Sequence, residues 1–445
     1  MTAIVTKKTR IANADNFIEA FSELSSDRYY LGIGRDSVWA SEPTPDIPKD
    51  NDETVTGAWN NLIGMKLVSP ANIKTVIKNV LWETGTIYEQ YSDKLVGMFY
   101  VNGVNVLPVY AINSSGRIYK CIETPRINGI RQPSTVMPNA TSSPVFQTAD
   151  GYRWKYMGDV SLADYNAFAT DEYFPVKPYL HADDGSDQWL QQDAAIDGAV
   201  HCIEVNSGGT GYTDGAAITL TTSTGTGFTG TIVAPTGTIT KINVTNAGSG
   251  YRDAVVNLTG TGGNGASLRA ILSPIGGHSS HLREELEGIY VMVKCILDST
   301  EGGVLPVGSD FRQVFLVKNP KTTNLGMKLV LTGYSVDVPF TSGTTVKSGV
   351  NQGTVVSWDS QSGVLYVSGI TTGFTGGQSL DIVGGDTGVA TISDAFDDAY
   401  IPATAIAYAA ADIAYGSGEL VYIENRVKIQ RNLDQTEDVR LVIEF

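Results

Sequence analysis

The chain has 445 residues, of which 42% are hydrophobic and 18% charged, and its formal net charge at pH 7 is −16. The length predicts two to four domains, and this hydrophobic content excludes an extended disordered protein. The acidic balance argues against nucleic acid as a partner, because a nucleic-acid binder neutralises phosphates with Lys and Arg. The same sign argument disfavours anionic membrane surfaces.

Cysteine usage and hydropathy predict a cytoplasmic place of synthesis. The cysteines are Cys121, Cys202 and Cys295, with no CxxC pair, which favours reduced, buried thiols over a disulfide framework. The N-terminal residues lack the apolar core of a signal peptide. The apolar stretch Ile401–Tyr415 is shorter than the roughly 18 residues of a membrane span. We therefore expect no membrane partner.

Residues 1–93 are predicted to form the N-terminal part of a mixed α/β platform domain. The expected elements are a helix over residues 13–24, with Asp15 as N-cap and Phe17, Ile18, Phe21 and Leu24 on its apolar face, a strand over Tyr29–Gly34, and a helix start at Ser69–Pro70. The apolar residues from Ile73 to Val80 fit either a continued helix or a strand, and periodicity does not decide between them.

Residues 94–196 are predicted to form a β-rich domain. Strands are expected at Phe99–Val101, Val109–Ile112, Arg117–Ile122 and Tyr152–Tyr156, with turns at Asn102–Gly103, Ser115–Gly116 and Asp150–Gly151. Ser161 is expected to cap a short helix that runs to Ala169, with Leu162, Tyr165 and Phe168 as its apolar face.

Residues 197–275 are predicted to be an inserted β repeat module rich in Gly and Thr. Ile203–Tyr212 matches Ile242–Tyr251 at an offset of 39 residues. Each copy predicts a strand, a Gly-rich turn that places Tyr212 or Tyr251 at a corner, and another strand. Exposed aromatic residues there would suit sugars or protein partners, whereas buried ones would only fix the turn, and we favour the structural role.

The rest of the chain is predicted to complete the platform and to carry a second β module. Residues 276–332 hold two apolar strands, Gly288–Leu297 and Phe311–Lys318. A weaker repeat, Phe340 and Phe374 each followed by a Thr and Gly turn, predicts a six- or seven-strand barrel over residues 333–394. Residues 395–445 are expected to add C-terminal strands, the last of which, Val439–Phe445, continues to the final residue. The fold class is therefore mainly β with a smaller α/β part, a platform carrying inserted barrel or sandwich modules.

His278-Ser-Ser-His281, followed by Glu284 and Glu285, is the clearest cluster of chemically versatile side chains. A metal site on a helix would need His residues at i and i+4. The spacing here is i, i+3, and Gly276–Gly277 predicts a loop. We therefore expect His side chains that cap a helix or bond to backbone, and we assign no catalytic, cofactor-binding or metal-binding residue.

Other motifs are weaker. Gly225–Gly230 fits GxGxxG but lies in a β repeat and not between a strand and a Rossmann helix. Asp183-Asp184-Gly-Ser-Asp187 lacks the closing Glu of a calcium loop, so a solvated turn is expected. Phe396-Asp397-Asp398 is also expected to be a loop. No cofactor is expected, although a carboxylate pair of a glycosidase is defined by tertiary distance and not by spacing.

Several segments resemble one protein family. They are Val439–Phe445, Phe311–Pro320, Phe146–Met157, Asp27–Arg35, Trp82–Tyr91 and Thr300–Val304. Together they resemble a baseplate wedge subunit of contractile-tailed bacteriophages, gene product eight in the usual numbering. In that family a Gly-Gly-His segment before an acidic and hydrophobic run recurs as a structural feature. Residues 203–272 and 333–394 depart from the family pattern.

The resemblance implies a non-enzymatic, homodimeric virion protein of the tail baseplate, assembled in the host cytoplasm. Its partners would be other wedge proteins, and it would hold wedge geometry and relay the rearrangement that triggers sheath contraction. Two alternatives stay open from the sequence: a tail-associated glycan-binding module that uses the Gly/Thr/Tyr repeat, and a glycan-degrading enzyme.

Overall fold

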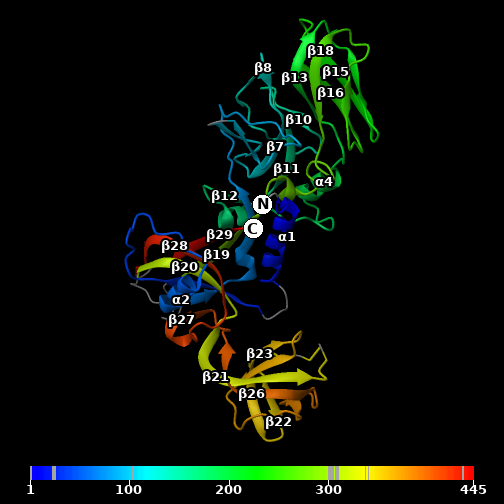
Figure 1. The fold of residues 1–445 in the computed structure, drawn as a ribbon. Helices are drawn as coiled ribbons and strands as arrows, with labels where there is room; N and C mark the ends of the chain where they lie inside the picture. The colour runs from blue at the N-terminus through cyan, green and yellow to red at the C-terminus, as the bar shows by residue number, and fades with distance from the viewer. Residues whose placement is uncertain are drawn as a thin grey trace. The chain divides into compact units, whose positions relative to one another are not determined.

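The computed structural model in Figure 1 describes residues 3–22, 27–102, 105–298, 305, 310–335, 337–338, 340–432 and 435–445. It is mainly β, with 43% strand and 11% helix, which confirms the predicted fold class. The chain divides into two compact units: unit 1 is Met1–Ala14, Lys74–Met292 and Ile443–Phe445, and unit 2 is Asp15–Ile73 and Val293–Val442. Among the helices of the described residues, none has the length and hydropathy needed to cross a membrane.

The centre of unit 1 is a four-stranded antiparallel sheet with the order β10-β11-β7-β6. Its strands are β6 (Tyr110–Ile112), β7 (Arg117–Glu123), β10 (Phe146–Gln147) and β11 (Arg153–Asp159). Alternate residues of β7 and β11 point to opposite faces. One face contributes a fully buried aromatic cluster that includes Tyr119, Trp154 and Tyr156. The strands expected in this region are confirmed.

Short elements surround this sheet. They are hairpin β4 (Phe99–Asn102) with β5 (Asn105–Pro108), hairpin β8 (Arg126–Ile127) with β9 (Ile130–Arg131), α3 (Leu162–Phe168), β12 (Tyr173–Pro175), α4 (Asp187–Asp193) and α5 (Leu282–Glu285). Ser161 caps α3 as predicted, since its Oγ accepts a hydrogen bond from Asp164 N. The apolar face predicted for α3 is wrong in part, because Leu162 and Tyr165 are exposed and only Phe168 is buried.

Strand β3 (Ile73–Lys78) resolves the ambiguity left by the sequence. Ser69 and Pro70 begin only a single 3-10 turn, η1 (Pro70–Asn72), with Ser69 as its cap. The chain then becomes extended and pairs with β12. Four of the six residues in β3 are β-branched, which suits a buried strand better than a helix.

The repeat module contains two sheets. Its strands are β13 (Cys202–Thr210), β14 (Ala217–Thr221), β15 (Thr226–Val233), β16 (Lys241–Ser249), β17 (Val255–Asn257) and β18 (Asn264–Ile271). β13 pairs with β18, and the others form a sheet with the order β16-β15-β14-β17. Each sequence repeat gives a strand, a Tyr-bearing corner and a second strand, as predicted.

Both corner tyrosines are buried and hold their turns, which confirms the structural role. Tyr251 Oη accepts a hydrogen bond from Phe228 N at 3.1 Å, and Tyr212 Oη accepts one from Ala266 N at 3.2 Å. A Cβ at Gly225 would lie 2.5 Å from the Tyr251 ring, and one at Gly263 would lie 2.5 Å from the Tyr212 ring. The first glycine of the GxGxxG pattern, Gly225, is therefore explained by its close packing on Tyr251.

Helix α1 (Lys7–Glu19) begins earlier than predicted. Asp15 lies inside it and is not its N-cap, while Thr6 Oγ1 accepts from Thr9 N at 3.5 Å at the true start. Leu24 lies outside the described residues. Strand β29 (Glu437–Glu444) confirms the predicted C-terminal strand, and within unit 1 Phe445 N donates to Ile289 O.

Unit 2 is built on a five-stranded antiparallel sheet with the order β27-β2-β1-β20-β28. Its elements are β1 (Tyr29–Gly34), α2 (Asp52–Asn60), β2 (Leu62–Leu67), β20 (Asp310–Lys318), β27 (Ala407–Ala409), η2 (Ala410–Asp412) and β28 (Glu419–Gln430), together with most of β19 (Tyr290–Leu297) and β29. Ala58 and Trp59 of α2 pack into the core of this sheet with Tyr30 and Phe315. Unit 2 contains part of the predicted platform, whereas residues 74–93 and 276–292, also predicted to belong to the platform, lie in unit 1.

A closed six-stranded barrel, β21-β24-β23-β22-β25-β26, confirms the predicted barrel. Its strands are β21 (Lys321–Thr332), β22 (Thr345–Ser348), β23 (Asn351–Asp359), β24 (Val364–Ser368), β25 (Ser379–Ile382) and β26 (Ala390–Pro402). The barrel therefore extends beyond the predicted bounds of 333 and 394, because β21 and β26 pair along most of their length. Phe396 and Asp397, predicted to lie in a loop, belong to strand β26.

Candidate functional site

The polar centre of unit 1 begins with two lysines that face each other across the sheet. Lys120 of β7 and Lys155 of β11 are direct register partners, and both are buried, at 0% and 4% exposed. They lie on the face opposite to the Tyr119 and Trp154 aromatic cluster, because side chains alternate along a strand. Like charges placed directly opposite one another destabilise a sheet, so this pair requires compensation.

Glu285, at the end of α5, compensates one of the two lysines. Its Oε2 accepts from Lys120 Nζ at 2.9 Å, and its Oε1 accepts from Ser279 N at 2.6 Å. Lys120 also lies over the ring of Tyr91, 4.0 Å from the centroid. Despite its burial, Glu285 keeps a pKa of about 2, because the Lys120 charge and its hydrogen bonds favour the carboxylate.

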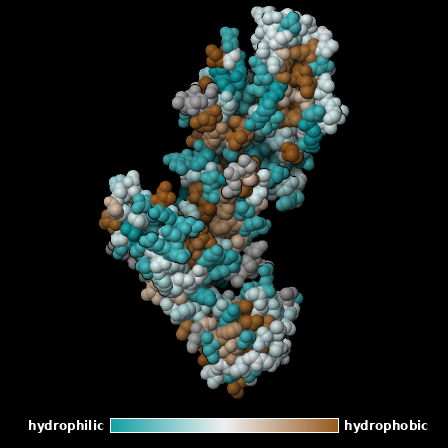
Figure 2. All heavy atoms as spheres, viewed as in Figure 1, coloured by the Kyte–Doolittle hydropathy of each residue, from teal (hydrophilic) through white to brown (hydrophobic). Residues whose placement is uncertain are grey.

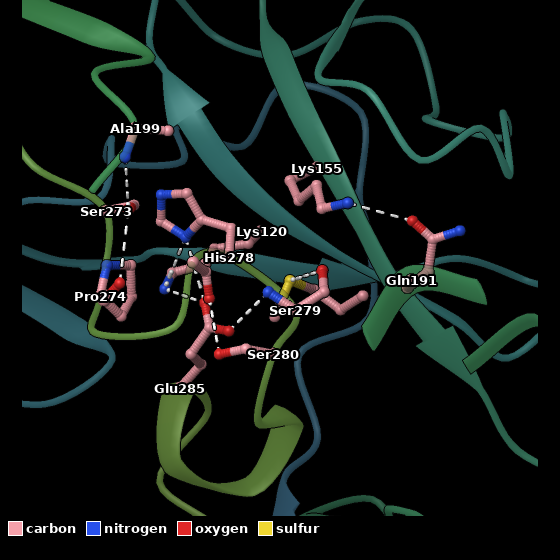
Figure 3. Close-up of polar contacts among 12 residues, drawn as sticks. Lys120, Lys155, Gln191, Ala199, Ser273, Pro274, His278, Ser279, Ser280 and Glu285 are labelled. Atoms are coloured by element: carbon pink, nitrogen blue, oxygen red, sulfur yellow. Dashed lines mark hydrogen bonds and ion pairs between the residues drawn. The ribbon is translucent and has the colours of Figure 1, made fainter. Parts of the chain in front are cut away.

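His278 is the third member of the cluster (Figure 3). Its Nδ1 lies 3.1 Å from Glu285 Oε2. The same nitrogen lies 3.5 Å from Lys120 Nζ. Because the carboxylate is the nearer group and can only accept, we assign the proton to Nδ1, which donates it to Glu285. Burial and the neighbouring Lys120 charge lower the pKa of His278 to about 4, so the ring is neutral and Nε2 is an acceptor.

The loop that carries His278 has a backbone that few residues tolerate. Gly276, Gly277 and Ser279 all have positive φ, and a Cβ on Gly277 would lie 2.6 Å from the backbone of Ile196. Ser279 is held in this conformation by Glu285 Oε1 and by its own Oγ, which donates to Tyr156 O at 3.1 Å. Such backbone costs about 1–3 kcal/mol and persists where surrounding contacts fix it.

Among the described residues, the hydrogen-bond acceptors of Lys155 are all neutral. Its Nζ donates to Ser143 O and, at 3.1 Å, to Gln191 Oε1 of α4. Gln191 Nε2 in turn donates to Ser143 Oγ and Thr141 O. Burial without a paired carboxylate lowers the pKa of Lys155 to about 8, although the charge of Glu285 opposes the shift.

A pocket of about 410 Å³ opens beside this cluster. Arg153, Lys155, His201 and His278 line it, together with the backbone of residues 244–248 at the end of β16. None of the described residues that line it is Asp or Glu. Arg153 donates to Glu123 Oε2 at 3.0 Å and to His201 O at 2.8 Å. Burial and nearby positive groups lower the pKa of His201 to about 3.

The structure brings His278 and Glu285 of the predicted cluster into contact and gives His281 a different role. His281 caps α5, since its Nδ1 accepts from Glu284 N at 3.2 Å, as predicted for a capping His. His278 instead bonds to a carboxylate and not to backbone. Within the described residues, no group of three or more His, Cys, Asp or Glu side chains is arranged to hold a metal ion.

The remaining motifs have structural roles. Asp183 Oδ1 accepts from Gly185 N and Asp184 Oδ1 accepts from Ser186 N, and these carboxylates are exposed, so the acidic run is the expected solvated turn. Cys121, Cys202 and Cys295 are free and buried, as predicted. Burial raises the pKa of the Cys295 thiol to about 12, which leaves it unreactive.

Sequence reasoning missed Lys120, Lys155 and His201. A signal was present, since each lysine stands in the middle of an aromatic-rich strand, in Ile118-Tyr-Lys-Cys121 and Arg153-Trp-Lys-Tyr156. No family model matches the chain, and no curated protein matches it.

Proposed function

We propose that the protein is a structural component of a phage tail baseplate wedge, which acts through contacts with neighbouring subunits and forms a homodimer. The resemblance of several segments to the wedge subunit family motivates the proposal. The role would be to hold wedge geometry and to relay the rearrangement that accompanies sheath contraction.

The structural observation that supports it is an apolar surface on the two small hairpins of unit 1. Val96, Val101, Val106, Ile127 and Ile130, here called the hairpin patch, are each more than half exposed. The hairpins lie side by side, because Arg131 of β9 lies 5.1 Å from the ring centroid of Tyr100 of β4. Figure 2 shows hydrophobic residues on the visible surface around β8.

Two-stranded hairpins are marginal in water by themselves, and clustered exposed aliphatic side chains mark interaction surfaces. Glu89 forms ion pairs with Arg126 and Arg131 at the base of the patch, so the aliphatic side chains are presented on a charged support. A neighbouring subunit that covers these tips would remove apolar area from water at about 25 cal/mol per Å².

The two tyrosines that suggested the glycan-binding alternative, Tyr212 and Tyr251, are buried, and their hydroxyl groups accept hydrogen bonds from the backbone of the module. That alternative would need another surface of the repeat module. The polar pocket of unit 1 gives the enzyme alternative a place to be tested, through turnover of saccharides by the purified chain.

The test is light scattering on the purified chain, followed by co-expression with the tail subunits of the same virus. We expect a dimer and a stable complex. Val101→Glu with Val106→Glu should weaken whichever contact uses the hairpin patch by about a hundredfold, because two buried apolar side chains are lost and two charges are desolvated. Val255→Glu, at an exposed valine of β17, is the matched control. A chain that stays monomeric and joins no tail subunit would overturn the proposal.

A further inference from the structure

The charges around the pocket of unit 1 do not balance. Glu285 neutralises Lys120, and Glu123 is shared between Arg153 and Lys241, whose Nζ lies 3.1 Å from Glu123 Oε1. Lys155 remains, with the neutral partners Ser143 O and Gln191 Oε1. The pocket wall therefore carries positive charge that no carboxylate among its lining residues offsets.

An uncompensated buried cation is expensive, since the effective penalty is several kcal/mol for each ion. In this sheet the penalty is increased by the direct opposition of Lys120 and Lys155. A methionine would fill the same space on β11 without that penalty. The position of Lys155 is therefore better explained by an anion that enters the pocket than by the stability of the free protein.

The pocket also offers an acceptor that the protein leaves unused. The Nδ1–H of His278 is directed to Glu285, so Nε2 presents a lone pair. Figure 3 shows this second ring nitrogen turned away from Glu285 and without a partner among the residues drawn. Within the part of the chain that the structure describes, His278 is 96% buried and Nε2 has no hydrogen-bond donor.

These two features select the same ligand. The ammonium of Lys155 and the guanidinium of Arg153 attract an oxyanion, whereas the lone pair on His278 Nε2 repels a fully deprotonated oxygen and attracts a hydroxyl group. We propose that this pocket binds a small oxyanion that also carries a hydroxyl group, such as hydrogen phosphate, a phosphate monoester in its monoanionic form, or a hydroxy acid.

The pocket has the size and the rigidity for such a ligand. Its volume of about 410 Å³ falls in the usual range of about 300–1,000 Å³ for small-molecule sites. Lys155 is held by Gln191 of α4, and His278 is held by Glu285 of α5 and by the edge of the Tyr91 ring, 4.8 Å between centroids. Binding would therefore need little rearrangement of the lining side chains.

The experiment compares matched pairs of anions by isothermal titration of the full chain at pH 7 in 150 mM NaCl. Inorganic phosphate carries a P–OH group that sulfate lacks, and glycolate carries a hydroxyl that acetate lacks. We expect saturable binding of the hydroxylated member of at least one pair, about tenfold or more tighter than its partner, the factor equivalent to one hydrogen bond. The pair that shows the preference distinguishes a phosphate ligand from a hydroxy acid.

Three variants and one measurement on the unmodified chain assign the effect. Lys155→Met should abolish binding of both members, and His278→Phe should remove the preference for the hydroxylated member. Lys94→Gln, which removes an exposed charge of the same unit, should bind as the unmodified chain does. If a buried variant fails to fold, the imidazole ¹⁵N signals of the unmodified chain decide, because the ligand should shift Nε2 of His278 and leave Nδ1 protonated.

Three results would each overturn the proposal. The first is that none of the four anions binds saturably. The second is that phosphate binds as tightly as sulfate and glycolate as tightly as acetate, and the third is that Lys155→Met binds the anions as the unmodified chain does. The role in assembly is tested separately, because Lys155→Met leaves the hairpin patch intact. For Lys155→Met, loss of anion binding with normal co-assembly would support the pocket, and unchanged anion binding with normal co-assembly would reject the pocket while keeping the proposed function.

Discussion

The barrel of unit 2 and the β6–β11 sheet of unit 1 use opposite kinds of interior. The barrel core consists of aliphatic and aromatic side chains, among them Leu329, Leu365, Val367 and Ile392, all fully buried. The sheet has an aromatic core on one face and buries Lys120, Lys155, His278 and Glu285 on the other. Both regions are antiparallel β structure from one chain, so secondary structure does not explain the difference.

The comparison teaches that this chain can close a β module with apolar contacts alone. Buried ion pairs seldom stabilise more than hydrophobic residues of the same volume, and the barrel shows the apolar solution in use. The buried charges of unit 1 are therefore explained by something other than a contribution to the net stability of the fold. The loop with positive φ at Ser279 agrees with this view, because strained backbone concentrates at functional sites.

The substitution Glu285→Gln tests the contrast between the two interiors most directly. The neutral amide leaves Lys120 buried without a counter-charge and opposite Lys155, so we expect the free energy of unfolding to fall by about 3–5 kcal/mol. Urea denaturation, with amide exchange in β7 and β11 as a local probe, measures the loss. Glu284→Gln is the control, since Glu284 is the adjacent residue of α5, is partly exposed, and should change stability by less than about 1 kcal/mol. Equal effects of the two substitutions would refute the assignment.

A second variant completes that test. Adding Lys120→Met to Glu285→Gln removes the uncompensated charge, so the double variant should recover part of the loss, whereas independent sites would add. In the barrel, Leu365→Ala should cost about 2–5 kcal/mol through loss of packing, and no second substitution of a charged residue should restore it.

The features that could be predicted from the sequence are those determined by residues close together in the chain. The strands β7, β11, β20 and β29 were predictable because alternation is local. The corner tyrosines were predictable because the 39-residue repeat places Tyr212 and Tyr251 in the same context. The barrel was predictable in kind, but its ends were not, because the pairing of β21 with β26 joins residues about 60–80 positions apart.

The polar pocket could not be predicted because its members come from distant parts of the chain. Glu285 reaches Lys120 across 165 residues, and His201 lies at the boundary of the repeat module. Lysine in the centre of a strand usually faces solvent, and nothing near Lys155 in sequence shows that α4 will cover it. The sequence placed His278 and Glu285 in one cluster, but it did not predict that Glu285 would pair with Lys120.

Acid pH should weaken unit 1 more than the barrel. The folded pKa of His278 is lowered from 6.5 to about 4, so the unfolded chain takes up a proton first as pH falls below 6.5. Stability is therefore lost between about pH 6.5 and pH 4, by on the order of 3 kcal/mol. The groups facing His278 are Lys120, Lys155 and Glu285, and Glu285 extends the loss below pH 4.5, because its folded pKa is about 2.

Hydrogen exchange at a series of pH values measures this difference within the intact chain, after correction for the intrinsic pH dependence of exchange. Amides of β7 and β11 should lose protection between pH 6.5 and 4, while those of β23 (Asn351–Asp359) and β24 (Val364–Ser368) should keep it, because their shared core is apolar. His278→Phe should reduce the response of unit 1 without removing it, because His201, whose folded pKa is also lowered, to about 3, contributes over the same pH range. Parallel loss of protection in both regions would contradict the contrast between them.

The interior of the repeat module is intermediate between the apolar barrel core and the charged face of the unit 1 sheet. Substitutions in it should have the smallest effect on stability. Its interior is mostly apolar, with single neutral hydrogen bonds from Phe228 N to Tyr251 and from Ala266 N to Tyr212. Tyr251→Phe keeps the ring on Gly225 but leaves the Phe228 N–H without an acceptor, which should cost about 1–2 kcal/mol. Tyr212→Phe should cost about the same, because the two corners are equivalent. Tyr400→Phe, at a half-exposed tyrosine of β26, should change stability by less than about 0.5 kcal/mol. If either tyrosine substitution lowered the free energy of unfolding as much as Glu285→Gln does, neutral and charged interiors would be equally sensitive to substitution. That result would contradict the contrast between the two kinds of core.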